Sequence, residues 1–329
     1  MARTTKRPSR LEPDGFVVDA AGQTAAPLVS VVLPTHLSPP PYLKEAVASV
    51  VDQTWTRWEL VVVDDGSPDP DGVAKVLGDV DPRVRIVRTV RGGPAQARNL
   101  GAAHATGDLI TFLDHDDVWY PEHLSKSVAA LVGDAAAVAA FAAMEIVSAD
   151  RAHGRTVEGR EVDRHTVLSG GDRPSLNALV IRRAWFDEVD GFDTRYECGE
   201  DVDLIFKLVE HGHFAYVDEV AAIYRIHDEN WSGDTRRTGV SVDRMMGDHL
   251  RRARRSGDTE ARRDLRGSKR HGRRFYAEVA VGKAVATWRA KQHWSAVVLM
   301  WWAMRFSPVG AMRGAGKLVA RRWPGKGAA

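Results

Sequence analysis

The sequence of 329 residues predicts an α/β fold in which a mostly parallel sheet is flanked by helices and followed by a basic helical extension. Three observations support this prediction. Short apolar runs that contain β-branched residues alternate with segments of helical periodicity between residues 28 and 117. Two of these runs end in acidic clusters. The charge also changes sign along the chain: residues 1–235 carry 23 basic and 38 acidic side chains (net −15), and residues 236–329 carry 23 and 6 (net +17).

The first predicted strand is Leu28–Leu33, a β-branched run that ends at Pro34 and is typical of a strand buried on both faces. Further strands of this kind are predicted at Leu60–Val63, Val84–Val87 and Leu109–Leu113. Helices are predicted between them, over Leu43–Val50, where apolar residues recur every three or four positions, and over Ala95–Ala105. Strands that alternate with helices in this way form a parallel sheet, which binds ligands beyond the carboxyl ends of its strands.

The alternation of strands and helices loosens after residue 135. We expect a core element at Ala136–Ile146, a polar excursion at Ser148–Arg164, strands at Ala178–Ile181 and Val220–Tyr224, and a helix at Asp201–Glu210. The chain therefore divides into a flexible leader over residues 1–27, an α/β domain over residues 28–235, and a basic helical region with several tryptophans over residues 236–329.

The composition excludes several classes of protein. A single cysteine, Cys198, excludes an intramolecular disulfide framework and a cysteine-rich zinc site. The first 15 residues lack the apolar stretch of a secretory signal. No run approaches the roughly 18–20 apolar residues of a membrane-spanning helix. We therefore expect a cytoplasmic protein that does not span a membrane.

The first acidic cluster is Asp64-Asp65-Gly66-Ser67. An aspartate directly after a buried strand can accept hydrogen bonds from a base or a ribose hydroxyl, and the glycine permits a tight turn. The same residues also suit an ordinary turn that is capped by Asp or Ser. This cluster alone does not decide between the two interpretations.

The second acidic cluster is Asp114-His115-Asp116-Asp117. Carboxylates one residue apart at a strand end can share a divalent cation that also contacts two phosphates. Such a cation stabilises the charge on a departing diphosphate. The alternative is that three acids cap a helix beginning near Pro121, but one cap does not need three acids. The cluster therefore favours a metal site.

A third acidic pair, Glu200-Asp201, follows Gly199 at the start of a predicted helix. A carboxylate there can act as a general base on an acceptor hydroxyl, and it can equally complement the helix dipole. Taken together, the three clusters predict, in order, a contact with a nucleotide, a metal that also binds phosphates, and a general base.

The motifs of residues 28–232, taken in order, resemble glycosyltransferase family two, the inverting enzymes of GT-A fold. The motifs that carry the resemblance include Val29-Ser-Val-Val-Leu-Pro-Thr35, Glu59-Leu-Val-Val-Val-Asp-Asp-Gly-Ser67, Phe112-Leu-Asp-His-Asp-Asp117, Glu200-Asp-Val-Asp-Leu204 and Tyr224-Arg-Ile-His227. The resemblance implies a GT-A type, Rossmann-like sheet with a nucleotide half at about residues 28–117 and an acceptor half at about residues 118–235.

The resemblance also implies a role for individual residues. Those implied to bind the nucleotide sugar are Pro34, Thr35, His36, Asp64, Asp65, Arg98, Asp114 and His115. Asp116 would contact a divalent cation, Mn²⁺ or Mg²⁺, and His227 would be a mobile ligand near the diphosphate. Asp201 matches the catalytic base, with Glu200 as its neighbour or as a ligand of the acceptor. His115 departs from the usual motif, and His227 could instead be a strand-end histidine that only packs.

The implied function is metal-dependent, inverting transfer of a sugar from a nucleotide-diphosphate sugar to a hydroxyl of a glycan, lipid-linked or small-molecule acceptor. Synthesis of a cell-surface polysaccharide or glycoconjugate is the implied setting. Two alternatives stay open: a catalytically silent nucleotide-sugar or membrane-docking module, and a sugar-1-phosphate nucleotidyltransferase. The second is less favoured because no glycine-rich basic loop follows the first strand.

The basic region combines cations with tryptophans. Residues 236–274 hold 14 basic and 5 acidic side chains, and Trp288, Trp294, Trp301 and Trp302 follow. Tryptophan and cations favour the headgroup zone of an anionic membrane, so we expect peripheral contact with the inner face of the cell membrane. A helix hairpin that packs on the α/β domain would show the same apolar stripe. Nucleic acid is not expected, because no aromatic residues are interleaved with the 236–274 cations as in a binding module.

Overall fold

A computed structural model describes residues 17–18, 24–36, 39–148, 154–157, 160–171, 173–226 and 234–322. The chain separates into two compact units. The sheet unit comprises Met1–Val167, Asp172–Arg195 and Glu200–His227, and the helical unit comprises Leu168–Gly171, Tyr196–Gly199 and Asp228–Ala329. The boundary predicted between residues 235 and 236 falls at the beginning of helix α8 (Thr235–Arg255).

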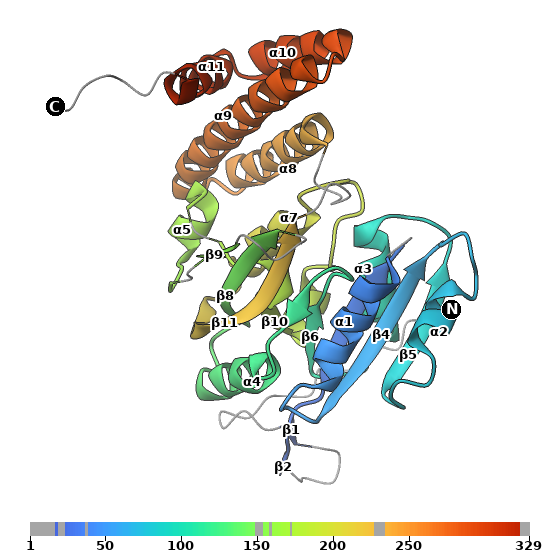
Figure 1. Ribbon diagram of the computed structural model, residues 1–329. Coiled ribbons are helices and arrows are strands. Elements are labelled where there is room, and N and C mark those ends of the chain that lie inside the picture. Colours follow the sequence, from blue (N-terminus) through green and yellow to red (C-terminus); the bar gives the residue numbers. More distant parts are fainter. Residues whose placement is uncertain are drawn as a thin grey trace, which may run out of the picture. The chain divides into compact units, whose positions relative to one another are not determined.

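The described residues of the sheet unit form a mixed nine-stranded sheet (Figure 1). Its strands are β3 (Val29–Thr35), β4 (Trp58–Asp65), β5 (Val84–Thr89), β6 (Leu109–Phe112), β7 (Val118–Trp119), β8 (Ala139–Ser148), β9 (Gly154–Val157), β10 (Leu179–Arg182) and β11 (Phe214–Ile226). They lie in the order β5-β4-β3-β6-β10-β8-β11-β7, and β9 pairs with β8. The neighbours β5, β4, β3 and β6 are parallel, as are β8 and β11, which confirms the predicted mostly parallel sheet. Strand β10 is antiparallel to both of its neighbours.

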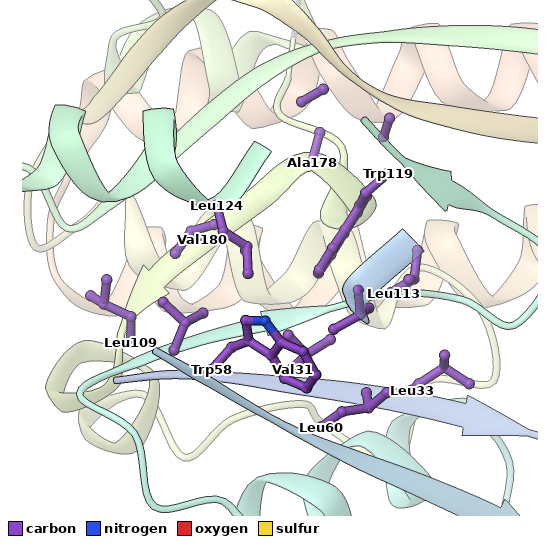
Figure 2. Packing of buried hydrophobic residues seen from close by; sticks show 14 of the residues in the cluster. Val31, Leu33, Trp58, Leu60, Leu109, Leu113, Trp119, Leu124, Ala178 and Val180 are labelled. Carbon is purple, nitrogen blue, oxygen red and sulfur yellow. The ribbon is translucent and has the colours of Figure 1, made fainter. Parts of the chain in front are cut away.

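Helices cover both faces of this sheet. Buried residues of α1 (Pro40–Val51), α2 (Gly72–Leu77) and α4 (His123–Gly133) join one hydrophobic cluster with residues of the strands, shown in part in Figure 2. Val31 of β3 belongs to this cluster, while the next residue, Val32, faces α3 (Pro94–His104) on the other side. Gly101 allows the close approach of α3, since a Cβ there would lie 2.3 Å from Cγ1 of Val32. Successive residues of a buried strand thus fill two cores.

The short elements of the chain were the hardest to predict. The predicted polar excursion over Ser148–Arg164 is wrong in part, because β9 lies within it and pairs with β8. The side chains of β9 are mostly exposed, so no apolar alternation marks it as a strand. The sequence pattern also did not indicate β1 (Val17–Val18), β2 (Thr24–Ala25), β7, α5 (Arg164–Ser169), η1 (Leu176–Ala178) or α6 (Arg183–Glu188). The helix predicted at Asp201–Glu210 is α7 (Glu200–Leu208).

The helical unit contains α8, α9 (Thr259–Arg289), α10 (His293–Phe306) and α11 (Pro308–Arg322), which confirms the predicted helical region. Asp234 and Asp258 cap the first two helices by accepting backbone hydrogen bonds. A small core lies between α9, α10 and α11. Trp302 belongs to this core, so its predicted place among the membrane-facing tryptophans is wrong. Within the described residues, no helix combines the length and apolarity needed to cross a bilayer.

Candidate active site

Parallel pairing brings the strand ends of the sheet unit to one edge. Thr35, the last residue of β3, is paired with Asp64 near the end of β4, and Asp64 is paired in turn with Arg88 of β5. Strand β6 ends two residues before Asp114. The predicted donor-site residues therefore gather at the carboxyl edge of the sheet, where open α/β sheets bind their ligands.

Arg98 connects the second and third acidic clusters. It lies on α3 and is only 5% exposed. Its Nη1 donates a hydrogen bond to Oε1 of Glu200 at 2.8 Å, and its Nη2 donates to Oδ1 of Asp114 at 2.6 Å. Its guanidinium also lies 5.5 Å from the centre of the Phe192 ring. One buried guanidinium thus holds together two predicted clusters that are far apart in the sequence.

The charges around Arg98 shift its titration and that of Glu200. Burial disfavours the charged guanidinium, but Asp114 and Glu200 together raise the pKa of Arg98 above its ordinary value. Burial raises the pKa of Glu200 to about 7, against the opposing effect of Arg98, and the neighbouring Asp201 raises it further. Arg98 therefore stays charged, whereas Glu200 exchanges its proton near neutral pH.

Asp201 lies in the first turn of α7, beside Glu200. Its Oδ1 accepts a hydrogen bond from the backbone nitrogen of Val202 at 2.8 Å, and its side chain is partly exposed. A partly exposed carboxylate beside a buried ion pair can meet a hydroxyl that approaches from solvent. This arrangement suits a general base.

Asp117 supports the second cluster from within the core. It is fully buried and accepts hydrogen bonds from the backbone nitrogen of Arg225 at 3.0 Å and from Nδ2 of Asn177 at 2.8 Å. Burial, followed by the charges of Asp116 and Asp114, raises its pKa well above the ordinary value. Asp116 is itself 7% exposed, and His115 is partly exposed. The loop after β6 therefore brings three acidic residues together, and the buried Asp117 anchors this loop to the core.

The first cluster forms the predicted turn and also holds a neighbouring loop. Both carboxylate oxygens of Asp65 accept backbone hydrogen bonds, from Gly92 at 2.7 Å and from Gly93 at 2.8 Å. Asp64 accepts from the backbone nitrogen of Ser67 at 2.9 Å and forms an ion pair with Arg88. The turn interpretation is thus confirmed for Asp64, while contact of either aspartate with a base stays a prediction.

The end of β3 supplies the remaining predicted nucleotide contacts. Pro34 and Thr35 are buried, and His36 is partly buried at the strand end. Neither ring nitrogen of His36 has a hydrogen-bond partner within the described part of the chain. An imidazole in this state can both donate to and accept from a ligand.

The sequence of residues 30–182 matches the family model described as glycosyl transferase family 2. These residues form a glycosyl transferase family 2 domain. All the predicted nucleotide-site residues lie in it, as does Asp116. Glu200 and Asp201 lie beyond its matched range, and Arg98 connects Glu200 to it.

Relatives of known sequence match parts of this chain. The succinoglycan biosynthesis protein ExoW of Rhizobium meliloti is 40% identical over 100 residues, which are 29% of this chain and 31% of ExoW. An uncharacterized glycosyltransferase of Rickettsia felis is 26% identical over 213 residues, which are 63% of this chain and 35% of the relative. The chain thus spans about a third of the length of these two relatives.

The fold is similar to that of solved glycosyltransferase structures. S. aureus TarS 1–349 in complex with UDP-GlcNAc gives a TM-score of 0.52 at 18% identity, and the match covers 83% of this chain and 90% of that one. The complex of the same protein with UDP gives 0.51 at 21% identity, covering 69% and 71%. The sheet unit therefore has the predicted GT-A type fold.

The residues of the family 2 domain fit a divalent cation. Carboxylate oxygens are the ligands that Mg²⁺ prefers, and one or two of them commonly act together with phosphate oxygens of the substrate. Asp116 supplies such a carboxylate. Among the described residues, no group of three or more His, Cys, Asp or Glu side chains could hold a metal. His227, the second predicted ligand, lies outside the described residues.

The sequence patterns did not single out several supporting residues of the site. Asn177 and the backbone of Arg225 hold Asp117, and Arg88 pairs with Asp64. Asn177 was visible as a polar residue inside the apolar segment Leu176–Ile181, where a buried amide needs a partner. Arg88 gave no such signal, because an exposed arginine is ordinary on a strand at the edge of a sheet.

Proposed function

We propose that this protein is a metal-dependent, inverting glycosyltransferase that moves a sugar from a nucleotide-diphosphate sugar to an acceptor hydroxyl. The observation that carries the proposal is the bridge from Asp114 through the buried Arg98 of the family 2 domain to the buried Glu200 beyond it. Burying a guanidinium and a carboxyl such as those of Arg98 and Glu200 is costly unless they are paired, and a core with no ligand to bind would be as stable with apolar residues. The bridge thus supports a built active site.

The chain's own residues divide the reaction between them. Asp201 takes the proton from the acceptor hydroxyl as this hydroxyl attacks the anomeric carbon. Arg98 supplies fixed positive charge beside Asp114, on the donor side, and keeps Glu200 next to the base. Asp65 fixes the loop at residues 92–93 beside the predicted base pocket. A single displacement needs no covalent intermediate, so the product is the inverted anomer.

Asp116 is the residue that would hold Mn²⁺ or Mg²⁺, with Asp117 fixing the loop behind it and His227 as the second proposed ligand. A bound cation supplies positive charge that stabilises a leaving nucleoside diphosphate. Asp114 and His115 lie in the same loop, at the end of the bridge where we propose that the nucleotide sugar binds.

The setting of the reaction is proposed from the relatives. ExoW is named for succinoglycan biosynthesis, which supports a role in polysaccharide or glycoconjugate synthesis with a glycan, lipid-linked or small-molecule acceptor. TarS was solved with UDP and with UDP-GlcNAc, so uridine nucleotides are the first donors to test. We place the protein in the cytoplasm, in peripheral contact with the membrane through residues 236–329.

A donor screen tests the proposed function. The full chain is incubated with UDP-, GDP-, ADP- and dTDP-sugars in MnCl₂, in MgCl₂ or in EDTA, and its melting temperature and the release of nucleoside diphosphate are measured. A donor that binds only the folded chain raises the melting temperature, by an amount that grows with its concentration. We expect one nucleotide series to give a metal-dependent shift together with slow donor hydrolysis.

The alternatives predict other results in the same screen. A metal-dependent shift without hydrolysis or transfer would indicate a catalytically silent nucleotide-sugar module. Formation of a nucleotide sugar from a sugar 1-phosphate and a nucleoside triphosphate would indicate a nucleotidyltransferase. No shift with any donor would contradict the proposal.

A further inference from the structure

Helix α10 has a second apolar face that is exposed. Trp294 and Trp301 are 79% and 65% exposed, and Val297 and Met304 are exposed as well. These four residues are spaced by three, four and three positions, so they lie on one side of the helix. A contiguous exposed apolar stripe of this kind marks a surface that contacts something else.

The opposite face of α10 already provides the packing that the helical unit needs. Ala296 and Ala303 are buried, and Trp302 is 9% exposed and stacks on Phe306 with ring centres 4.5 Å apart. Trp302 and Ala303 belong to the core shared with α9 and α11. The exposed stripe is therefore not part of this core.

Exposed cations flank the stripe in the sequence, and Arg305 lies beside one of its rings. Arg289 and Lys291 precede α10 and are exposed, and Arg313 follows it on α11. Arg305, also exposed, lies with its guanidinium carbon 5.9 Å from the centre of the Trp301 ring. Residues 236–329 carry 23 basic side chains and only 6 acidic ones. A partner of this stripe therefore has to be apolar at its centre and anionic around it.

We propose that the exposed face of α10 docks on the surface of an anionic lipid bilayer, with Trp294 and Trp301 at the level of the headgroups. The apolar bodies and polar N–H groups of tryptophan suit this zone, and the surrounding cations attract anionic lipids. With 14 residues, α10 is about 21 Å long, so it would lie in the plane of the interface rather than cross it. The proposal deepens the membrane contact of the proposed function by naming the surface that makes it.

A second copy of this chain fits the stripe less well. Pairing two stripes would bring together two regions that each carry a net charge of +17. Four side chains on one short helix also cover much less than the roughly 800 Å² per partner of a stable interface. Like-charge repulsion and small area both favour a lipid surface over a second copy.

Vesicle flotation of the full chain tests the proposal. Vesicles of phosphatidylcholine alone and with about 30% phosphatidylglycerol are used at low and high NaCl, without donor, because screening weakens surface electrostatics. We expect binding to the anionic vesicles at low salt. The double variant Trp294→Ser/Trp301→Ser should bind at least tenfold more weakly, with an unchanged circular dichroism spectrum and melting temperature, because both side chains are exposed.

A matched control separates the stripe from general hydrophobicity. Phe275→Ser removes another exposed aromatic ring of the helical unit, from α9, and should bind vesicles like the wild type. The proposal is overturned if the wild type does not float, if the double variant floats equally well, or if ultracentrifugation shows a dimer that only the double variant disrupts. Nucleoside diphosphate release is measured without vesicles, so failure of membrane docking and failure of sugar transfer are seen separately.

Discussion

Charged residues are arranged in opposite ways in the two units. In the sheet unit, Arg98, Glu200 and Asp117 are buried, and each has partners that the fold positions. In the helical unit, cations and large apolar side chains are exposed together on α10 and around it. Buried charge is costly and persists only where paired, whereas exposed charge costs little. Burial therefore distinguishes the candidate active site from the surface proposed to dock on a membrane.

The largest effect is expected at the base in the sheet unit. Asp201→Asn keeps an oxygen that accepts the hydrogen bond of Val202, so the start of α7 should stay intact. Losing the base should lower turnover by about 10²–10⁴-fold and leave donor affinity nearly unchanged. Turnover is measured as sugar transfer, and affinity as the donor-induced shift in melting temperature.

Asp187→Asn is the matched control for this change. Asp187 is an exposed aspartate of α6 that forms an (i, i+4) ion pair with Arg183, and exposed pairs contribute little. Both activity and stability should stay near the wild-type values. Wild-type turnover in Asp201→Asn would show that Asp201 is not the general base.

The next largest effect tests the two faces of α10. Trp302→Ala removes a buried ring from the small core of the helical unit and should lower the free energy of unfolding by about 3–5 kcal/mol. Trp301→Ala, at the next position, removes an exposed ring and should change it by less than about 0.5 kcal/mol. Urea unfolding followed by circular dichroism measures both. Equal losses in the two variants would show that the stripe belongs to a core.

The third prediction concerns the pH dependence of the buried bridge. The pKa of Glu200 is about 7 in the folded chain, against an ordinary value of 4.5. Its contribution to stability is thus fully present below pH 4.5 and is lost as the pH rises through 7. Glu200→Gln cannot ionise, so it escapes this loss. Its free energy of unfolding, relative to the wild type, should rise by about 3 kcal/mol between pH 4.5 and pH 8.

Urea unfolding of both proteins across this pH range gives the comparison. Only the change of the difference with pH is informative, because Gln also alters the hydrogen bond with Arg98, and this effect is present at every pH. If the difference in free energy of unfolding between the two proteins did not change with pH, the pKa of Glu200 would be the ordinary one. Glu200 would then be less buried than the structure shows.

The smallest effects compare two glycines, one in each unit. An alanine Cβ at position 101 would lie 2.3 Å from Val32 and 2.9 Å from Val63, so Gly101→Ala should cost about 1–3 kcal/mol. Among the described residues, no atom beyond the helix's own backbone lies within 4 Å of the corresponding position at Gly282 of α9, so Gly282→Ala should stabilise the helix by roughly 0.5–1 kcal/mol. Urea unfolding measures both variants, and we expect changes of opposite sign in the free energy of unfolding.

Long, strongly patterned elements could be predicted from the sequence, and short or antiparallel ones could not. The apolar, β-branched runs of β3, β4 and β6 and the helical spacing of α1 and α3 predicted these elements correctly. Strand β10 was found as a strand, but its antiparallel direction depends on its neighbours β6 and β8. Strand β9 carries no apolar signal, because pairing at an edge needs only backbone groups.

The candidate site shows the same limit. Sequence order named Arg98, Asp114 and Glu200, but assigned them to separate roles. Their hydrogen bonds to one another depend on the packing of α3 beside the strand ends, which no local pattern encodes. Likewise, the tryptophan pattern of the basic region did not show that Trp302 turns inward while Trp301 turns outward.

The sequence by itself determined the α/β class, the order of the main strands and helices, the family resemblance and the change in charge along the chain. These features are local or additive, because periodicity, composition and motifs are written in neighbouring residues. Only the tertiary structure decided which charges are buried together and which apolar side chains are left outside. Burial depends on contacts between distant segments, and it is burial that marks the Arg98 bridge as a candidate site and leaves the stripe of α10 exposed.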